Sequence, residues 1–223
     1  AYGANEPKQN AANLRTKGWE LMLTWNDAFK LANKPFRYNL SVGLADNTSE
    51  ITKFDNPSKI LSDYYVGQKL GDIWGYVVDG LFRTDEEAAN YNVDQTAVNF
   101  VINTAQVNPG LHAGDMKFVD LDGDHTISSG SNTADDPGDR KIIGNSLPRY
   151  TYSIQGGFDW YGFDFSIYLQ GVGHQDWYPG TNSVFFWGPY ARPYSSFIPR
   201  DFLSQVWSPE NPDAYFPRPI GYL

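Results

Sequence analysis

The sequence has no cysteine, only three histidines and few basic residues, and each shortage excludes a class of protein. Without cysteine there is neither a disulfide framework nor a Cys-ligated zinc or iron–sulfur site, although oxidising and reducing compartments both tolerate a Cys-free chain. Lys and Arg number 17 against 26 Asp and Glu, which gives a net charge of −9. The chain therefore lacks the basic footprint of a nucleic-acid-binding protein.

Long apolar runs are missing as well, because no stretch approaches the roughly 20 apolar residues that a membrane-spanning helix requires. The 223 residues suffice for one large domain or two small ones. Aromatic residues make up 16% of the chain, too many for a disordered protein. The first residue is Ala1 and not Met, from which we expect a mature or truncated chain.

Four segments alternate between apolar and polar residues, the period of β-strands. They are residues 19–26, 36–46, 150–160 and 163–170. In the first, for example, the odd positions are Trp, Leu, Leu and Trp, and the even positions are Glu, Met, Thr and Asn. Successive side chains of a strand point to opposite faces, so each segment has one apolar and one polar face. The pattern predicts an all-β fold with about four antiparallel strands.

The connections between these segments are of two kinds. A short link at residues 30–35 and a tight turn at Tyr161 and Gly162 each predict a hairpin. Residues 52–147 form a far longer connection, and residues 173–223 follow the last segment. Short turns therefore lie at one end of the sheet and long segments, which are usually functional, at the other.

Two architectures fit this alternation. A soluble sandwich packs its apolar face in a core, whereas an outer-membrane barrel turns that face to lipid and has short periplasmic turns and long outer loops. Aromatic residues gather beside the short turns and resemble one interfacial girdle: Trp25, Phe29, Phe36, Phe158, Trp160 and Phe163. Four strands do not close a barrel, so we expect either further strands elsewhere or a fragment.

The first long segment carries two local motifs. Thr84, followed three residues later by Glu87, is a capping box that predicts the start of a short helix. Further on, Asp120, Asp122 and Asp124 have the spacing of a calcium loop, to which Thr126 could add a carbonyl oxygen. The EF-hand pattern is incomplete, because position six is His125 and not Gly. An Asp-rich turn is the preferred alternative, and a bound Ca²⁺ would be structural.

Catalytic motifs are missing. There is no H-E-x-x-H, no G-x-S-x-G elbow and no phosphate-binding Gly–Lys loop, so we assign no catalytic residue and do not expect an enzyme. Near the end of the chain Trp177, Tyr178, Trp187 and Tyr190 form an aromatic stretch that would suit stacking on sugars. The preferred alternative is packing of loops on each other or on a partner protein, where Tyr and Trp are also enriched.

Six sequence motifs, in this order, resemble the C-terminal barrel portion of SusC/RagA-type TonB-dependent outer-membrane transporters of Bacteroidota. They are TKGWEL (16–21), GDIWGY with DGLF (71–76 and 79–82), GDMKFVDLDGD (114–124), IGNSLPRY (143–150), FDFSIYLQGVG (163–173) and WSPENP (207–212). Any one of these motifs is weak evidence for the resemblance, but all six in this order are specific. The family's usual Gly after Asp-Gly-Asp is His125 here.

The resemblance implies a segment of a large transmembrane β-barrel over residues 1–223, with residues 52–147 and 173–223 as extracellular loops and the plug domain and final strands absent. It further implies the outer membrane as location, membrane lipid and a SusD-like lipoprotein as partners, and TonB-driven import of glycans or peptides. Five polar residues would line the lumen: Glu20, Arg37, Asn39, Gln155 and Asp164. The alternatives are a soluble β-rich carbohydrate-binding module and a secreted glycosidase domain.

Overall fold

The computed structural model describes residues 10–98, 110–180, 190 and 198–219. The chain divides into two compact units. The first contains Ala1–Ile73 and Gly144–Trp177, and the second contains Trp74–Ile143 and Tyr178–Leu223. Among the described residues, no helix is both long enough and apolar enough to cross a membrane.

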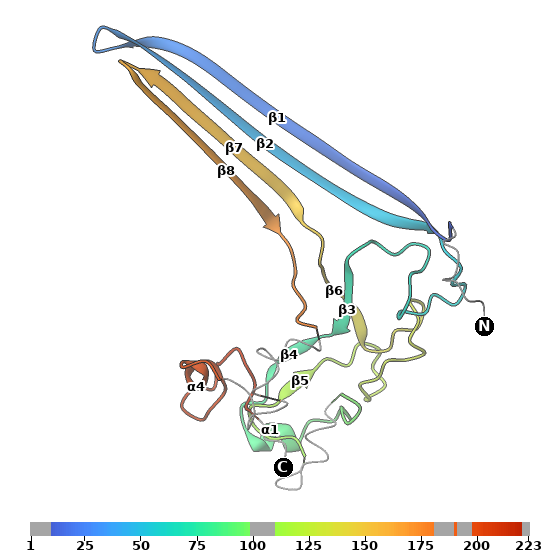
Figure 1. The fold of residues 1–223 in the computed structure, drawn as a ribbon. Helices are drawn as coiled ribbons and strands as arrows, with labels where there is room; N and C mark the ends of the chain where they lie inside the picture. Colours follow the sequence, from blue (N-terminus) through green and yellow to red (C-terminus); the bar gives the residue numbers. More distant parts are fainter. Residues whose placement is uncertain (1–9, 99–109, 181–189, 191–197, 220–223) are drawn as a thin grey trace, which may run out of the picture. The chain divides into compact units, whose positions relative to one another are not determined.

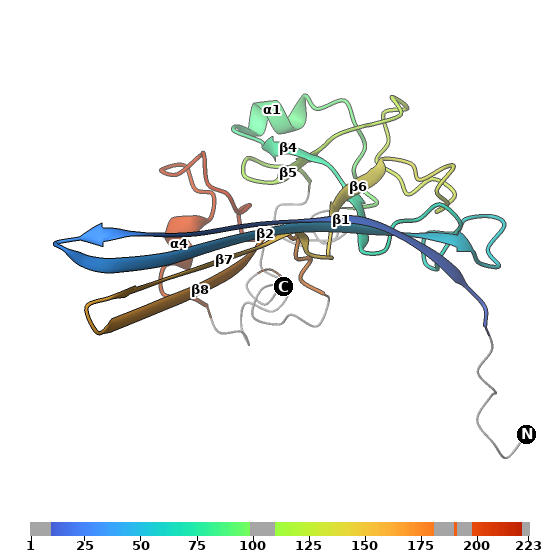
Figure 2. The same cartoon turned by 90° about the horizontal axis from the view of Figure 1, so that it is seen from above.

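The first unit is an antiparallel sheet of four long strands (Figure 1). Its order is β1 (Asn13–Leu31), β2 (Lys34–Lys53), β7 (Arg149–Trp160) and β8 (Phe163–His174). Figure 2 shows the same strands from above, with β1 and β8 along the two edges. The all-β fold and its four antiparallel strands are confirmed, and the architecture is that of a barrel segment.

Both hairpins are confirmed, and each turn contains two residues with positive φ. In the β1–β2 turn φ is 49° at Ala32 and 62° at Asn33. In the β7–β8 turn φ is 50° at Tyr161 and 85° at Gly162. Two successive left-handed residues are the mark of the type I′ turn, whose twist matches that of the strands it joins. The two turns lie at the same end of the sheet, because Phe36 pairs with Trp160 across the β2–β7 interface.

The first hairpin is longer than its apolar pattern predicted. β1 has 19 residues and β2 has 20, whereas β7 and β8 have 12 each. Alternation with an apolar face ends near Trp19 on β1, yet the ladder with β2 continues back to Asn13 through residues that are mostly polar, Leu14 and its partner Ile51 excepted. Hydrophobic periodicity detects only half-buried or lipid-exposed strand segments, so these polar ends carried no signal.

Beyond Asp46, strand β2 exchanges its partner β7 for a returning loop segment. Ile51 donates its backbone N–H to Gln68 O at 2.9 Å and accepts from Gly67 N at 2.9 Å. Ile51 is buried there (1% exposed). At the point of exchange Arg149 makes a two-pronged ion pair with Asp46, with both N–O distances 2.6 Å. This pair ties β7 to β2 where their ladder ends.

The remaining elements are short and belong to the long connections. They are β3 (Asp72–Tyr76), which pairs with β6 (Arg140–Asn145), β4 (Val78–Leu81), which pairs with β5 (Met116–Phe118), and the helices α1 (Asp85–Ala89) and α4 (Phe202–Gln205). Of these, the sequence predicted only α1. The N-cap is confirmed: Thr84 Oγ1 accepts from Glu87 N at 3.1 Å, and Glu87 Oε2 accepts from the backbone N–H of Arg83, the residue before the cap, at 2.9 Å.

The second unit has a small core of mixed character. Phe82 and Ile127 are completely buried, and the Phe82 ring meets the edge of Tyr91 at 5.1 Å. The buried Gln95 side chain donates to Met116 O at 2.8 Å and accepts from Phe118 N at 3.2 Å. The Gln95 amide thus holds strand β5 by two hydrogen bonds inside the core. Such a core depends on these hydrogen bonds as well as on apolar burial, because an unpaired buried amide would be costly.

Candidate functional site

The long sheet has two faces of opposite character, which its register defines. One, here called the apolar face, carries exposed hydrophobic side chains on every strand. Leu23 is 61% exposed and Ile167 is 44% exposed. Its members are Trp19, Leu21, Leu23, Trp25, Phe29, Phe36, Tyr38, Leu40, Val42, Leu44, Tyr152, Ile154, Phe158, Trp160, Phe163, Phe165, Ile167 and Leu169. Contiguous apolar surface of this extent marks contact with a membrane or another protein.

Aromatic rings cross the apolar face at the hairpin end. The ring centroids of Phe29 and Phe36 are 5.0 Å apart, those of Phe36 and Phe158 5.4 Å, and those of Phe158 and Phe165 5.4 Å. One ring thus comes from each strand. Trp160 Nε1 donates to Leu31 O at 3.3 Å, which joins the two hairpins near their turns. The predicted gathering of aromatic residues beside the short turns is therefore present.

The opposite face, here called the polar face, contains the five residues predicted to line a lumen. Arg37, Asn39, Gln155 and Asp164 border one hollow of about 610 Å³ near the hairpin end. Glu20 borders a second hollow of about 760 Å³ farther along the sheet. The structure therefore brings four of the five together and separates Glu20 from them.

Glycine makes room for these hollows. A Cβ atom on Gly157 would lie 2.8 Å from Phe165 O, and one on Gly43 would lie 2.7 Å from Ser153 Oγ. Both glycines belong to the polar face, opposite Asn39 and Ser153 respectively. Without these small residues the face would be covered by side chains, so the hollows depend on the two positions.

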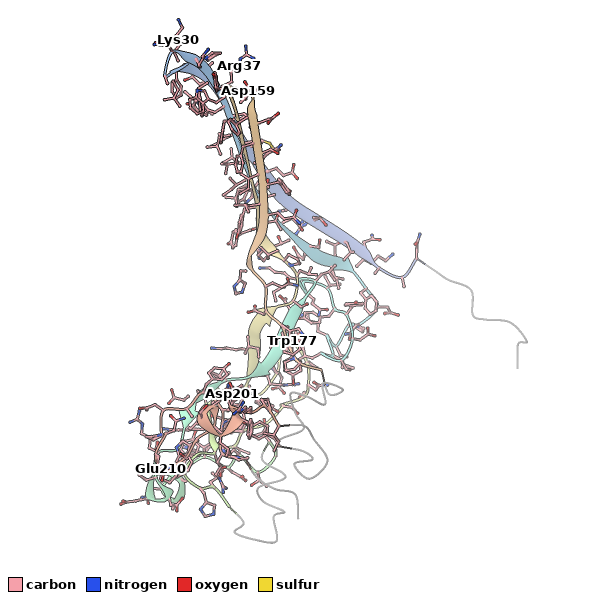
Figure 3. The ribbon with its side chains drawn as sticks, turned by 60° about the vertical axis from the view of Figure 1, so that its left-hand side comes forward. Lys30, Arg37, Asp159, Trp177, Asp201 and Glu210 are labelled. Carbon is pink, nitrogen blue, oxygen red and sulfur yellow. The ribbon has the colours of Figure 1, made fainter. Side chains whose placement is uncertain are left out.

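The first hollow holds a charged row that the sequence did not reveal. Arg37 pairs in register with Asp159, and Asp159 pairs with Asp164 on the next strand. Figure 3 shows Arg37 and Asp159 side by side at the hairpin end. Like charges directly opposite destabilise a sheet, whereas an Arg beside an Asp stabilises it by about 0.2–1 kcal/mol. Asp159 was missed as a site residue because the β2–β7 register joins segments that are distant in sequence.

The second unit is organised around two buried carboxylates. Asp115 (1% exposed) accepts from Arg218 Nε at 2.6 Å, from the second Arg218 nitrogen at 2.9 Å and from His112 N at 2.8 Å. Asp139 (0% exposed) accepts from Leu121 N and from Ser128 N, both at 2.7 Å. Each carboxylate binds backbone of a neighbouring loop, so these residues shape the unit and are not available for catalysis.

The three aspartates of the predicted calcium loop do converge. Carboxylate oxygens of Asp120, Asp122 and Asp124 lie within 4.8 Å of one another. Asp120 accepts from Gly123 N at 2.7 Å and from His125 N at 2.9 Å, and Asp124 accepts from Thr126 N at 2.7 Å. These local bonds are those of the Asx-turn alternative.

His125 occupies the position where an EF-hand has glycine, and its φ of 65° is left-handed all the same. The turn therefore forms without glycine. The Asp124 backbone N–H lowers the pKa of Asp122, but burial and the charges of Asp124, Asp139 and Asp120 outweigh it, so that pKa is raised. Crowded negative charge of this kind is relieved by a cation.

The predicted ligand-binding aromatics differ in their surroundings. Trp177 is 71% exposed and Tyr178 is 58% exposed. Tyr190 packs its ring against Phe202, with centroids 6.0 Å apart, and burial raises the pKa of its hydroxyl to about 12. Trp187 lies outside the described residues. Tyr190 thus packs on another loop residue, as the alternative to sugar binding predicted. A sugar-binding role for Trp177 and Tyr178 stays a prediction.

Comparison with known proteins gives three relatives, all from Formosa agariphila. The protein called TonB-dependent receptor P39 is 27% identical over 188 residues, which are 74% of this chain and 17% of that protein. TonB-dependent receptor P3 is 22% identical over 75% of this chain and 16% of its own length. TonB-dependent receptor P26 is 23% identical over 98% of this chain and 20% of its own length.

The chain therefore spans only 16–20% of the length of the curated relatives that it matches. No protein-family model matches it. All three relatives are named as receptors, and none of the three names describes an enzyme. They do not distinguish one subfamily of receptor from another.

Proposed function

We propose, from the homology of this chain to TonB-dependent receptors, that it supplies part of the wall of an outer-membrane β-barrel and that the whole protein imports nutrients with energy from the TonB complex. One observation carries the proposal: the four-stranded sheet has an exposed apolar face along its length and a polar, hollowed face behind it. Transmembrane barrels have this arrangement, with the apolar side towards lipid and the polar side towards the lumen.

The height of the apolar face supports a lipid contact. On β1 it extends from Trp19 to Phe29. Roughly eleven residues at about 3.3 Å each, tilted by about 40°, rise about 25–28 Å, close to the ~25 Å apolar band of outer-membrane barrels. The exposed apolar face argues against the soluble carbohydrate-binding alternative, in which it would be packed in a core.

The edges of the sheet support a larger assembly. Within the described residues, β1 pairs only with β2 and β8 pairs only with β7. Unpaired backbone groups are costly in lipid, and a closed barrel removes them. Further strands of a longer protein would therefore complete the sheet at both edges.

The finer proposal is a SusC-type receptor that works with a SusD-like lipoprotein lid and takes up glycans or peptides. The ordered series of motifs from residue 16 to residue 212 supports it. Residues 52–147 and 173–223 would be extracellular, since they follow the sheet end opposite the short turns. Glu20, Arg37, Asn39, Gln155 and Asp164 would then face the barrel interior and the transport path.

Deletion of the gene in the producing bacterium tests this function. We expect growth to fall at least tenfold on one class of oligomer in a panel of polysaccharides and protein digests, with growth on monosaccharides unchanged as the control. The tagged full-length receptor, purified from outer membranes in detergent, should bring down a lipid-anchored protein at near-equal stoichiometry. Unchanged growth on the whole panel would contradict import, and a receptor without such a partner would contradict the SusC-type assignment.

A second proposal is that Asp120, Asp122 and Asp124 hold a structural Ca²⁺ ion, with Thr126 as a further oxygen donor. Hard carboxylate oxygens at this spacing suit Ca²⁺. The convergence of the three carboxylates within 4.8 Å supports it. The ion would hold the loop that Asp139 fixes from the other side.

Calcium should therefore raise the melting temperature of the protein. At 100 times the dissociation constant the gain is about 2.7 kcal/mol, or roughly 5–10 °C for a chain of this size. Differential scanning fluorimetry in CaCl₂ and in EGTA measures it. Asp122→Asn should abolish the shift, whereas Asp213→Asn, which removes an exposed carboxylate in the same unit, should retain it. Equal melting temperatures in calcium and EGTA would rule out the ion.

A further inference from the structure

Cationic side chains follow the apolar face immediately beyond its last hydrophobic row, at the end away from the hairpin turns. Lys17 and Arg15 continue the odd-numbered positions of β1, so both point to the same side as Trp19 and Leu21. Lys17 pairs in register with Thr48, and Arg15 with Glu50. Both cations are exposed.

Lys69 joins this group from the loop that returns to β2. It forms an antiparallel bridge with Glu50, which places the two residues on the same side of the strand pair. The charges of Arg15, Lys17 and Lys69 all act on the Glu50 carboxylate. Arg15, Lys17 and Lys69 are here called the basic patch.

Three carboxylates lie near the basic patch, and each already accepts hydrogen bonds. Glu50 accepts from Arg15 at 2.8 Å, and Asp46 accepts from two guanidinium nitrogen atoms of Arg149. Asp72 accepts from the backbone N–H of Lys69 and from the Asn145 amide. The three cations of the patch and Arg149 exceed these three carboxylates by one positive charge, which the exposed ammonium groups of Lys17 and Lys69 share.

Lys17 lies at the depth of a headgroup layer. It is two residues beyond Trp19, which is about 5 Å of height for a strand tilted by about 40°. Arg15, and Lys69 through its bridge to Glu50, lie two residues farther, about 10 Å beyond Trp19, so their long side chains would reach the layer by extending back towards the apolar face. The polar layer of a bilayer extends about 5–7 Å beyond its hydrocarbon on each side. Lysine also snorkels, with its alkyl stem along apolar surface and its ammonium among the headgroups.

From this juxtaposition we infer that the basic patch binds the phosphate of anionic lipid headgroups, in the leaflet at the end opposite the hairpin turns. The inference rests on the proposed function, because it requires the apolar face to lie in lipid. The hairpin end is different: there the apolar face carries Asp27, and Lys34 lies over the Tyr161 ring at 5.1 Å. The three cations of the basic patch therefore give this end of the sheet the stronger attraction for anionic lipid.

Lipid binding by the full-length receptor in neutral detergent tests the inference, with fluorescent phosphatidylglycerol as the probe and phosphatidylcholine as the uncharged comparison. The double variant Lys17→Gln/Lys69→Gln should bind phosphatidylglycerol roughly thirtyfold more weakly, since each lysine near an anionic surface contributes about fivefold. Its affinity for phosphatidylcholine should not change. The matched variant Lys30→Gln/Lys34→Gln, with two lysines removed at the hairpin end, should bind both lipids as the wild type does.

Two results would overturn the inference. One is wild-type affinity of the Lys17/Lys69 variant for phosphatidylglycerol. The other is complete displacement of the lipid by 10 mM inorganic phosphate, which would mark the patch as a site for free anions. If the wild type bound neither lipid, the membrane location itself would fail, and this outcome is distinguishable because phosphatidylcholine binding is lost as well.

Discussion

Ile154→Arg is expected to destabilise the sheet by about 2–4 kcal/mol if the proposed orientation holds, the cost of an arginine near the bilayer midplane on the outside of a barrel. Ile154 lies in the middle of the apolar face, in a row with Val42 on β2 and Leu169 on β8. Its side chain is 36% exposed, so in the proposed orientation an arginine there would face lipid.

Gln155→Arg is the matched control, because the neighbouring residue points to the polar face and borders the hollow near Arg37. It introduces the same charge on the same strand and should change stability by less than about 1 kcal/mol. Refolding of the full-length receptor into phosphatidylcholine vesicles, followed by urea titration, measures both variants. Equal destabilisation by the two substitutions would show that the faces are not a lipid side and a lumen side.

Arg218→Ala is expected to cost the second unit about 3–5 kcal/mol, because it leaves the Asp115 carboxylate buried without its cation. Asp115 is 1% exposed and receives two hydrogen bonds from the guanidinium. Arg218 also donates its backbone N–H to Gly114 O at 2.9 Å. Alanine keeps this backbone hydrogen bond, so the loss of stability measures the contribution of the Arg218–Asp115 side-chain pair.

Arg83→Ala gives the comparison. Arg83 pairs with Asp213 at 2.8 Å, but the two side chains are 71% and 75% exposed, and exposed pairs contribute about 0–1 kcal/mol. Hydrogen exchange of residues 111–119 in the full-length protein measures the local opening. Faster exchange is expected for Arg218→Ala alone, and similar rates in both variants would mean that burial does not distinguish the pairs.

The strands and turns were the predictable part of this fold. Alternation located all four long strands, and the short links before Lys34 and Phe163 located both hairpins. The pairing of β2 with β7 was not predictable, since Leu40 and Gly156 are joined by a long segment and no local pattern records their register. The short strands β3 to β6 have three to six residues each, too few for a periodic signal.

The candidate site divides in the same way. Residues whose role follows from face alternation, such as Arg37 and Gln155, were found from the sequence. Asp159 and Lys69 were not, because their places depend on partners elsewhere in the chain. The Asp115–Arg218 pair joins residues 103 positions apart and shows no spacing that a single sequence could reveal.

The unequal lengths of the two hairpins have a consequence for access from outside the cell. β1 continues for six residues before Trp19, from Asn13 to Gly18, or about 15 Å of height at a tilt of about 40°. In the proposed orientation the open end of the β1–β2 ladder would pass through the headgroup layer and extend beyond it. Antibodies and proteases outside the cell would then reach this end of the strand pair, and a tag inserted at residues 57–59, in the loop after β2, should be accessible to antibodies on intact cells.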